Sequence, residues 1–244
     1  MLTDAHVHIG KSARLQIDIT GEFLVRTADE LGIDRIFCTD LTALFYDMFE
    51  GNRLLYQQMK IFPKRIIGYA SLHSTRFGSA ALDELQRCRD EYGMVGLKIY
   101  STPEASIAEP AMIPILEKCV DLKFVVLAHT TPSECEYLMQ AVPECRFMMA
   151  HAGGQPFAKG DWNRAIMAAQ RFENLYLETA SSTIDTNFVE TAVSILGPEK
   201  IIFGTDMPLL DPWTQMAKIR ETSIDSKSLD LILGGNIARL AGLT

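Results

Sequence analysis

Two histidines separated by a single residue stand near the start of the chain, in the sequence DAHVHIG. In a β-strand, alternate residues point to the same face, so His6 and His8 would leave the backbone side by side. Imidazole pairs of this kind can hold one divalent metal ion, and a carboxylate is a common further ligand. The spacing therefore predicts part of a metal site.

Three more candidate groups stand further along the chain: His129 in LAHT, His151 in AHAGG and Asp206 in FGTDMP. Each of them closes an apolar run that is typical of a strand. The chain has only five histidines, and four of them fall at such strand ends. Since parallel strands of a barrel end at the same face, we expect these three groups to converge with His6 and His8.

The elements that must position these residues alternate along the whole chain. Eight apolar runs begin at intervals of 22 to 33 residues, which leaves room for one helix after each strand. This cadence predicts the α/β fold class, as a (β/α)₈ (TIM) barrel that forms a single domain over residues 1–244. The alternative is an open doubly wound sheet, but no GxGxxG follows the first strand. The predicted strands begin at Leu2, Arg35, Arg65, Met94, Lys123, Cys145, Leu175 and Ile201.

The intervening segments have apolar residues at helical spacing and end at helix-stop signals. Residues 23–32 end at a glycine, residues 78–92 are followed by Gly93, and residues 186–197 precede a proline. The last segment, 226–243, is expected to form a C-terminal helix that breaks near Gly234 and Gly235.

Strand periodicity also predicts which residues face the barrel interior. Asp4 should point inward together with the two histidines of the first strand, whereas Ala5 and Val7 should pack on the helices. In the strand from Met94, the same argument turns Lys98 and Tyr100 inward, and in the seventh strand it turns Glu178 inward.

Composition and charge exclude several other classes of protein. The chain has 244 residues, 48% of them hydrophobic, and a formal net charge of −8, which argues against nucleic acid as a partner. No stretch is apolar for long enough to span a bilayer, and the first residues have neither a basic stretch nor an apolar signal core, so secretion is not expected. The five cysteines are scattered without a CxxC pair, so a reducing, cytoplasmic location is expected.

Taken in order, the motifs resemble the amidohydrolase superfamily, and most closely its compact amidohydrolase-related branch of hydrolases and non-oxidative decarboxylases. The matching pieces are DAHVHIG, GLKIY, LAHT, AHAGG, FGTDMP and the closing ILGGNIARLAGL. The resemblance implies that His6, His8, His129 and Asp206 bind the metal, most simply one Zn²⁺. It implies that Asp206 also shuttles the proton of an activated water. His151 would then be a ligand of a second metal or a catalytic acid or base.

Lys98 decides between one metal and two. In binuclear relatives, a lysine at this strand is carboxylated and bridges two ions, which requires a neutral amine. Otherwise, Lys98 would hold a substrate carboxylate as a point charge, or would pair with a buried acid such as Glu178 or Asp4.

The leading prediction of function is hydrolysis of an amide, ester or lactone bond in a small molecule. The alternatives are non-oxidative decarboxylation of an unsaturated or aromatic acid, and metal or ligand binding without turnover. Arg14 and Arg76, in loops after strands, are candidates for binding an anionic substrate, and residues 42–59 are a candidate lid or subunit contact. Relatives are commonly dimers or tetramers, so a homo-oligomer is expected.

Overall fold

The computed structural model describes the chain except residues 74–76, 103–104, 154–161, 182–186 and 244. A nine-stranded sheet curls around the centre of the molecule, with its strands in the order β2-β1-β3-β4-β5-β6-β7-β8-β9. From β1 and β3 through to β9, neighbouring strands run parallel. The strands are β1 (Thr3–Ser12), β2 (Ile17–Ile19), β3 (Arg35–Asp40), β4 (Ile66–Ser71), β5 (Gly96–Tyr100), β6 (Val125–His129), β7 (Arg146–Met149), β8 (Leu175–Glu178) and β9 (Ile201–Ile202).

The sheet closes into a barrel because β1 pairs with the segment that follows β9. Backbone hydrogen bonds join Ala5 N to Phe203 O at 3.1 Å, and Asp206 N to His6 O at 2.8 Å. A further bond joins His8 N to Met207 O at 2.9 Å. The predicted single-domain (β/α)₈ barrel is therefore confirmed, and its closure places Asp206 directly beside the histidines of β1.

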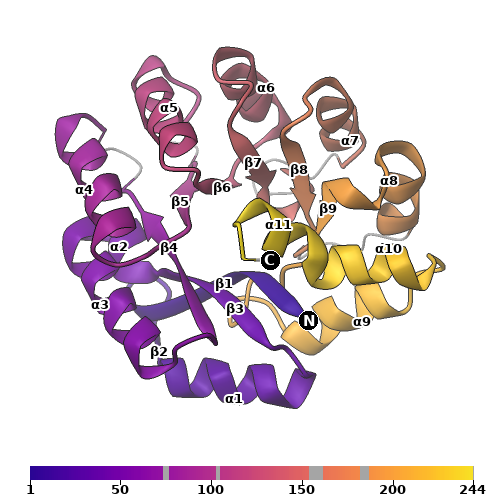
Figure 1. Cartoon of the computed structure of the whole chain (residues 1–244), viewed down its shortest axis with the longest axis horizontal. Coiled ribbons are helices and arrows are strands. Elements are labelled where there is room, and N and C mark those ends of the chain that lie inside the picture. The colour runs from indigo at the N-terminus through magenta and orange to yellow at the C-terminus, as the bar shows by residue number, and fades with distance from the viewer. Residues whose placement is uncertain (74–76, 103–104, 154–161, 182–186, 244) are drawn as a thin grey trace.

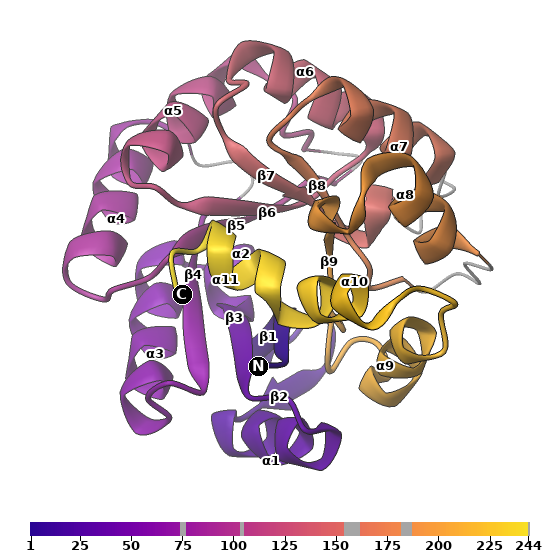
Figure 2. The same ribbon diagram turned by 45° about the vertical axis from the view of Figure 1, so that its right-hand side comes forward.

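Helices surround the barrel, as Figures 1 and 2 show. The predicted helices at residues 23–32, 78–92 and 186–197 are all present, and Gly32 caps the first of them in the left-handed region at φ 70°. The helices with α labels are α1 (Gly21–Leu31), α2 (Leu41–Phe45), α3 (Met48–Ile61), α4 (Ser79–Asp90), α5 (Ile113–Asp121), α6 (Pro132–Ala141), α7 (Trp162–Arg171), α8 (Phe188–Leu196), α9 (Pro212–Arg220), α10 (Ser226–Asp230) and α11 (Asn236–Leu240). Among the described residues, no helix is long and apolar enough to cross a membrane.

The C-terminal helix breaks where its glycines predict. A π-helical turn, Leu231–Gly235, separates α10 from α11. A Cβ atom on Gly234 would lie 2.2 Å from the carbonyl oxygen of Met1, so only glycine lets the two chain ends approach so closely. Beyond the break, Ile237 and Leu240 of α11 pack into the apolar cluster inside the barrel. This helix therefore closes the end of the barrel opposite the carboxyl ends of the strands (Figure 1).

Two features of the first strand differ from the predicted pattern. The register of β1 against β3 shifts between Asp4 and Val7, and this irregularity turns Ala5 into the inner apolar cluster rather than toward the helices. Val7 packs in the outer cluster, as predicted. Beyond the histidines, β1 continues into an antiparallel hairpin with the short strand β2, which the sequence analysis did not predict.

Candidate active site

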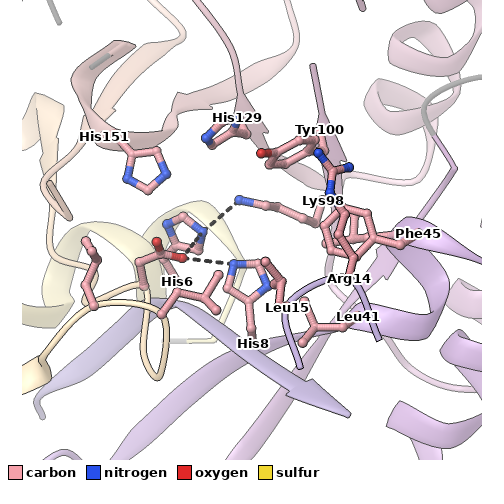
Figure 3. Close-up of a pocket in the computed structure, with 14 residues that line it drawn as sticks. His6, His8, Arg14, Leu15, Leu41, Phe45, Lys98, Tyr100, His129 and His151 are labelled. Carbon is pink, nitrogen blue, oxygen red and sulfur yellow. Dashed lines mark hydrogen bonds and ion pairs between the residues drawn. The ribbon is translucent and has the colours of Figure 1, made fainter. Parts of the chain in front are cut away.

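A cavity of about 260 Å³ opens at the carboxyl ends of the strands (Figure 3). All the candidate residues with catalytic or metal-binding predictions line this one cavity, although they come from five strands or the turns directly after them. They are His6, His8, Lys98, His129, His151 and Asp206.

His6 lies at the centre of the polar part of the cavity, where Glu178 of β8 orients its ring. Nδ1 of His6 lies 2.9 Å from Oε2 of Glu178, and both side chains are buried. Burial lowers the pKa of His6, so a neutral ring that donates Nδ1–H to Glu178 fits this contact, and burial also raises the pKa of Glu178. The lone pair of Nε2 is then directed toward the cavity, and a carboxylate behind a histidine in this way is typical of metal sites.

Asp206 meets both histidines of β1. Its Oδ1 lies 2.9 Å from Nε2 of His8 and 3.3 Å from Nε2 of His6. Burial alone would raise the pKa of Asp206, but the adjacent His6 and His8 rings hold it well below its usual range. The carboxylate is therefore ionised at neutral pH and able to accept a proton.

Lys98 is fully buried beside the same ring. Its Nζ lies 2.7 Å from Nε2 of His6, so an imidazole takes the place that one of the three alternatives gave to a buried acid, Glu178 or Asp4. Burial lowers the pKa of Lys98 to about 8, against the attraction of Asp206 and Glu178. Asp4 instead binds the segment after β9, because it accepts hydrogen bonds from the backbone N–H and the hydroxyl of Thr205.

His151 sits in a tight turn after β7, where its backbone has a positive φ of 57°. Its backbone N–H donates to Oε2 of Glu178, and its Nδ1 lies 2.8 Å from the carbonyl oxygen of Ala180. Because a carbonyl can only accept, Nδ1 carries the proton and Nε2 remains free to exchange one. The ring lines the cavity and lies 5.1 Å from the His6 ring, centroid to centroid (Figure 3). Nε2 can therefore contact a molecule bound in the cavity.

His129 ends β6 on the far side of the cavity. Its ring stacks on Tyr100 at a centroid distance of 4.1 Å and meets the His151 ring edge-on at 5.0 Å. Burial, with smaller effects of His151 and Lys98, lowers the pKa of His129 to about 2. The imidazole is thus neutral, which is the form that binds metals.

The distances between the possible ligand atoms of several of these side chains are short enough for a divalent ion. In the described part of the chain, two groups of three have donor atoms within 4.8 Å of one another: His6, His8 and Asp206, and His6, His151 and Glu178. His129 belongs to neither group, although it lines the same cavity. Two imidazoles and an ionised carboxylate fit a zinc-like ion, and both groups share His6.

Sequence reasoning missed part of the apolar wall on the other side of the cavity, namely Leu41, Leu209 and Leu210. Leu41 and Leu44 belong to α2, directly after β3, and Leu209 and Leu210 follow the FGTDMP motif. Their position immediately after strand ends is the signal that would have identified them. The lid candidate at residues 42–59 contributes Phe45 to this wall.

The chain's two tryptophans and its fifth histidine also follow predicted strands, where side chains could reach the cavity, but they lie elsewhere. Trp213 is 48% exposed, and Trp162 packs on Phe188 at a centroid distance of 5.6 Å. His73 follows β4 and is absent from the residues that line the cavity in the described part of the chain. Arg76 lies outside the described residues.

A family model described as amidohydrolase matches residues 43–243. The chain therefore belongs to the amidohydrolase family, in its compact amidohydrolase-related branch, and is an enzyme of that superfamily. A search of curated protein sequences finds no match.

Solved structures with the same fold include enzymes of different reaction classes. A 2,6-dihydroxybenzoate decarboxylase from Rhizobium has 16% identity and a TM-score of 0.80, with 100% of this chain and 99% of that chain covered. A dihydroxybenzoic acid decarboxylase from a Polaromonas species, with bound manganese and 2-nitroresorcinol, has 17% identity and a TM-score of 0.80 over 100% and 98%. A probable 2-pyrone-4,6-dicarboxylic acid hydrolase from Acinetobacter baumannii, with citric acid bound, has 18% identity and a TM-score of 0.76 over 99% of each chain.

Proposed function

We propose that this enzyme is a metal-dependent hydrolase that cleaves an amide, ester or lactone bond of a small molecule. The observation that carries the proposal is the contact of an ionised carboxylate, Asp206, with the Nε2 atoms of His6 and His8 in a buried cavity. His129 would complete the ligand set from the opposite side of the cavity. One divalent ion, most simply Zn²⁺, would acidify water and polarise the substrate carbonyl.

The side chains of the cavity can then divide the proton transfers between them. Asp206 would accept the proton of the attacking water, because its carboxylate is ionised and lies beside His6 and His8 in the cavity. His151 presents Nε2 to the substrate while the carbonyl of Ala180 accepts its Nδ1–H, so a ring protonated at both nitrogens would donate the Nε2 proton to the leaving group and become neutral. Lys98, within 2.7 Å of His6, adds positive charge where negative charge develops on the substrate.

The test combines metal content with turnover. Protein purified without chelators is expected to contain about one divalent ion per chain, and to hydrolyse a member of a panel of aryl esters, lactones and anilides. Removal of the ion with a chelator should abolish hydrolysis, and Zn²⁺ or Mn²⁺ should restore it. Metal-loaded protein that hydrolyses none of the panel would contradict the proposal.

Decarboxylation is the second candidate, and the similar decarboxylase folds favour it. In that reaction, His151 would protonate the carbon that loses CO₂. Release of CO₂ from hydroxybenzoates by the metal-loaded enzyme, lost in His151→Asn, would assign the protein to this class. No CO₂ from a broad panel of aromatic and unsaturated acids would exclude it.

A further inference from the structure

The cavity divides into a polar side and an apolar side. The polar side holds the histidines, Lys98 and Asp206, whereas the apolar side is formed by leucines and by Phe45. The volume of about 260 Å³ lies just below the ~300–1,000 Å³ that is common for ligand pockets. A molecule the size of one substituted ring therefore suits the cavity better than a peptide or an oligosaccharide.

Arg14 is the cation at the edge of the apolar side. It lies in the loop between β1 and β2, and its guanidinium carbon lies 5.6 Å from the centroid of the Phe45 ring (Figure 3). The loop is held in place, because the backbone N–H of Arg14 donates to Oη of Tyr46 at 3.0 Å. The N–H of Leu15 donates to Oγ of Ser12 at 3.2 Å. The hairpin that the sequence analysis missed thus positions the arginine at the cavity.

The charge of Arg14 has no acidic partner in the described part of the chain, where the ion pairs of arginine involve Arg53, Arg65, Arg87 and Arg171. Lys98, the other cation of the cavity, contacts His6 and is attracted by Asp206 and Glu178. A guanidinium with a planar fork of donors and no acidic partner among the described residues is well suited to a carboxylate.

A row of aromatic rings connects this arginine with the histidines. Phe45 meets Tyr100 edge-on at a centroid distance of 5.7 Å, and Tyr100 stacks on His129 at 4.1 Å. This wall would pack along a flat substrate, with one end at Arg14 and the other at the polar side.

We propose that Arg14 determines specificity by binding the carboxylate of a planar, single-ring substrate whose scissile bond lies at the histidines. The inference rests on the proposed function and names its substrate class. In this arrangement, the carboxylate is a recognition group at the far end from the reacting bond. Neutral analogues of the same shape would fill the cavity without the charged contact.

The experiment measures binding to the metal-loaded protein by ligand-observed NMR titration, with benzoate as the anionic probe and benzyl alcohol as the neutral one. Arg14→Gln should weaken benzoate binding by roughly 10-fold or more, because a charge-assisted contact is lost. It should change benzyl alcohol binding by less than about two-fold, and Arg14→Lys should retain part of the benzoate affinity.

Arg26 provides a matched control, since it is an exposed arginine stacked on Phe23 at 5.8 Å and is not among the residues that line the cavity. Arg26→Gln should leave the binding of both probes unchanged. Benzoate that does not bind, or that binds Arg14→Gln as well as the wild type, would overturn the inference. An equal loss of both probes would also overturn it, because that result indicates a general change in the cavity.

Binding is measured without turnover, so this result is separable from the test of hydrolysis. If the protein hydrolyses no compound of the panel, but Arg14→Gln selectively weakens benzoate binding, the carboxylate site is supported and the proposed hydrolysis is contradicted. If the protein hydrolyses neutral and carboxylate-bearing aryl esters with equal efficiency, the proposed hydrolysis is supported and the role of Arg14 is overturned.

Discussion

The two ends of the barrel interior are built from the same strands but differ in chemistry. On β6, Leu127 belongs to the inner apolar cluster, and His129, two residues later, lines the cavity. On β8, Tyr176 belongs to the apolar cluster, and Glu178 contacts the ring of His6 and the backbone N–H of His151. Strand periodicity thus places a stabilising layer directly below a reactive one.

This difference shows how the fold accommodates a costly site. At the reactive end, burial raises the pKa of Glu178 and lowers those of His6 and Lys98, so each of these groups is held against its preference for water. At the other end, α11 covers a predominantly apolar layer that offsets such costs. Substitutions at the reactive end should therefore impair chemistry, and substitutions at the apolar end should impair stability.

The largest effect is expected for Asp206→Asn at the reactive end. The amide cannot accept the proton of the attacking water, so kcat/KM should fall by ~10²–10⁴-fold. Steady-state kinetics measure this loss, and circular dichroism should show that the folded structure is retained. An activity within about three-fold of the wild type would show that Asp206 does not transfer the proton.

Phe37→Ala tests the apolar end, where we expect a loss of stability similar in energy to the loss of catalysis in Asp206→Asn. Phe37 is fully buried and packs on Tyr69 at a centroid distance of 5.2 Å. The cavity that the substitution leaves should lower the free energy of unfolding by about 3–5 kcal/mol, as measured by urea denaturation. The kcat of the folded fraction should change little, and a parallel loss of kcat would show that the two ends are coupled.

A smaller effect is expected for Glu178→Gln, which lies where the two layers meet. The variant retains the shape of the side chain but loses the charge behind His6, so metal affinity should fall about 10–100-fold. Competition with a chromophoric chelator measures this affinity. Glu84→Gln is the control, because Glu84 is equally buried but pairs with Arg87 on α4. Equal metal affinity in both variants would contradict the role assigned to Glu178.

The smallest effect is expected for Ile202→Val in the inner apolar cluster. Removing one methylene group from this buried position should lower the free energy of unfolding by about 0.5–1.5 kcal/mol. Metal content and kcat/KM should remain at their wild-type values. A loss of metal from this variant would show that the apolar layer also sets the geometry of the site.

The sequence by itself determined the barrel and most of the polar side of the site. Regular spacing of apolar runs predicted the strands, and alternation along them turned Lys98, Tyr100 and Glu178 inward, because both patterns depend on local backbone geometry. The predictions for residues at strand ends were robust because parallel strands in a barrel all end at one face.

Only the tertiary structure decided the contacts between elements. The irregularity in β1 turned Ala5 inward, and Lys98 reached His6 instead of an acid, since both depend on how neighbouring strands are shifted against one another. The short strand β2 and the position of Arg14 over Phe45 likewise depend on packing between segments distant in sequence. Local periodicity carries no information about such distances, so the polar residues of the site and the candidate Arg14 were predictable, whereas the packing of Arg14 on Phe45 and much of the apolar wall were not.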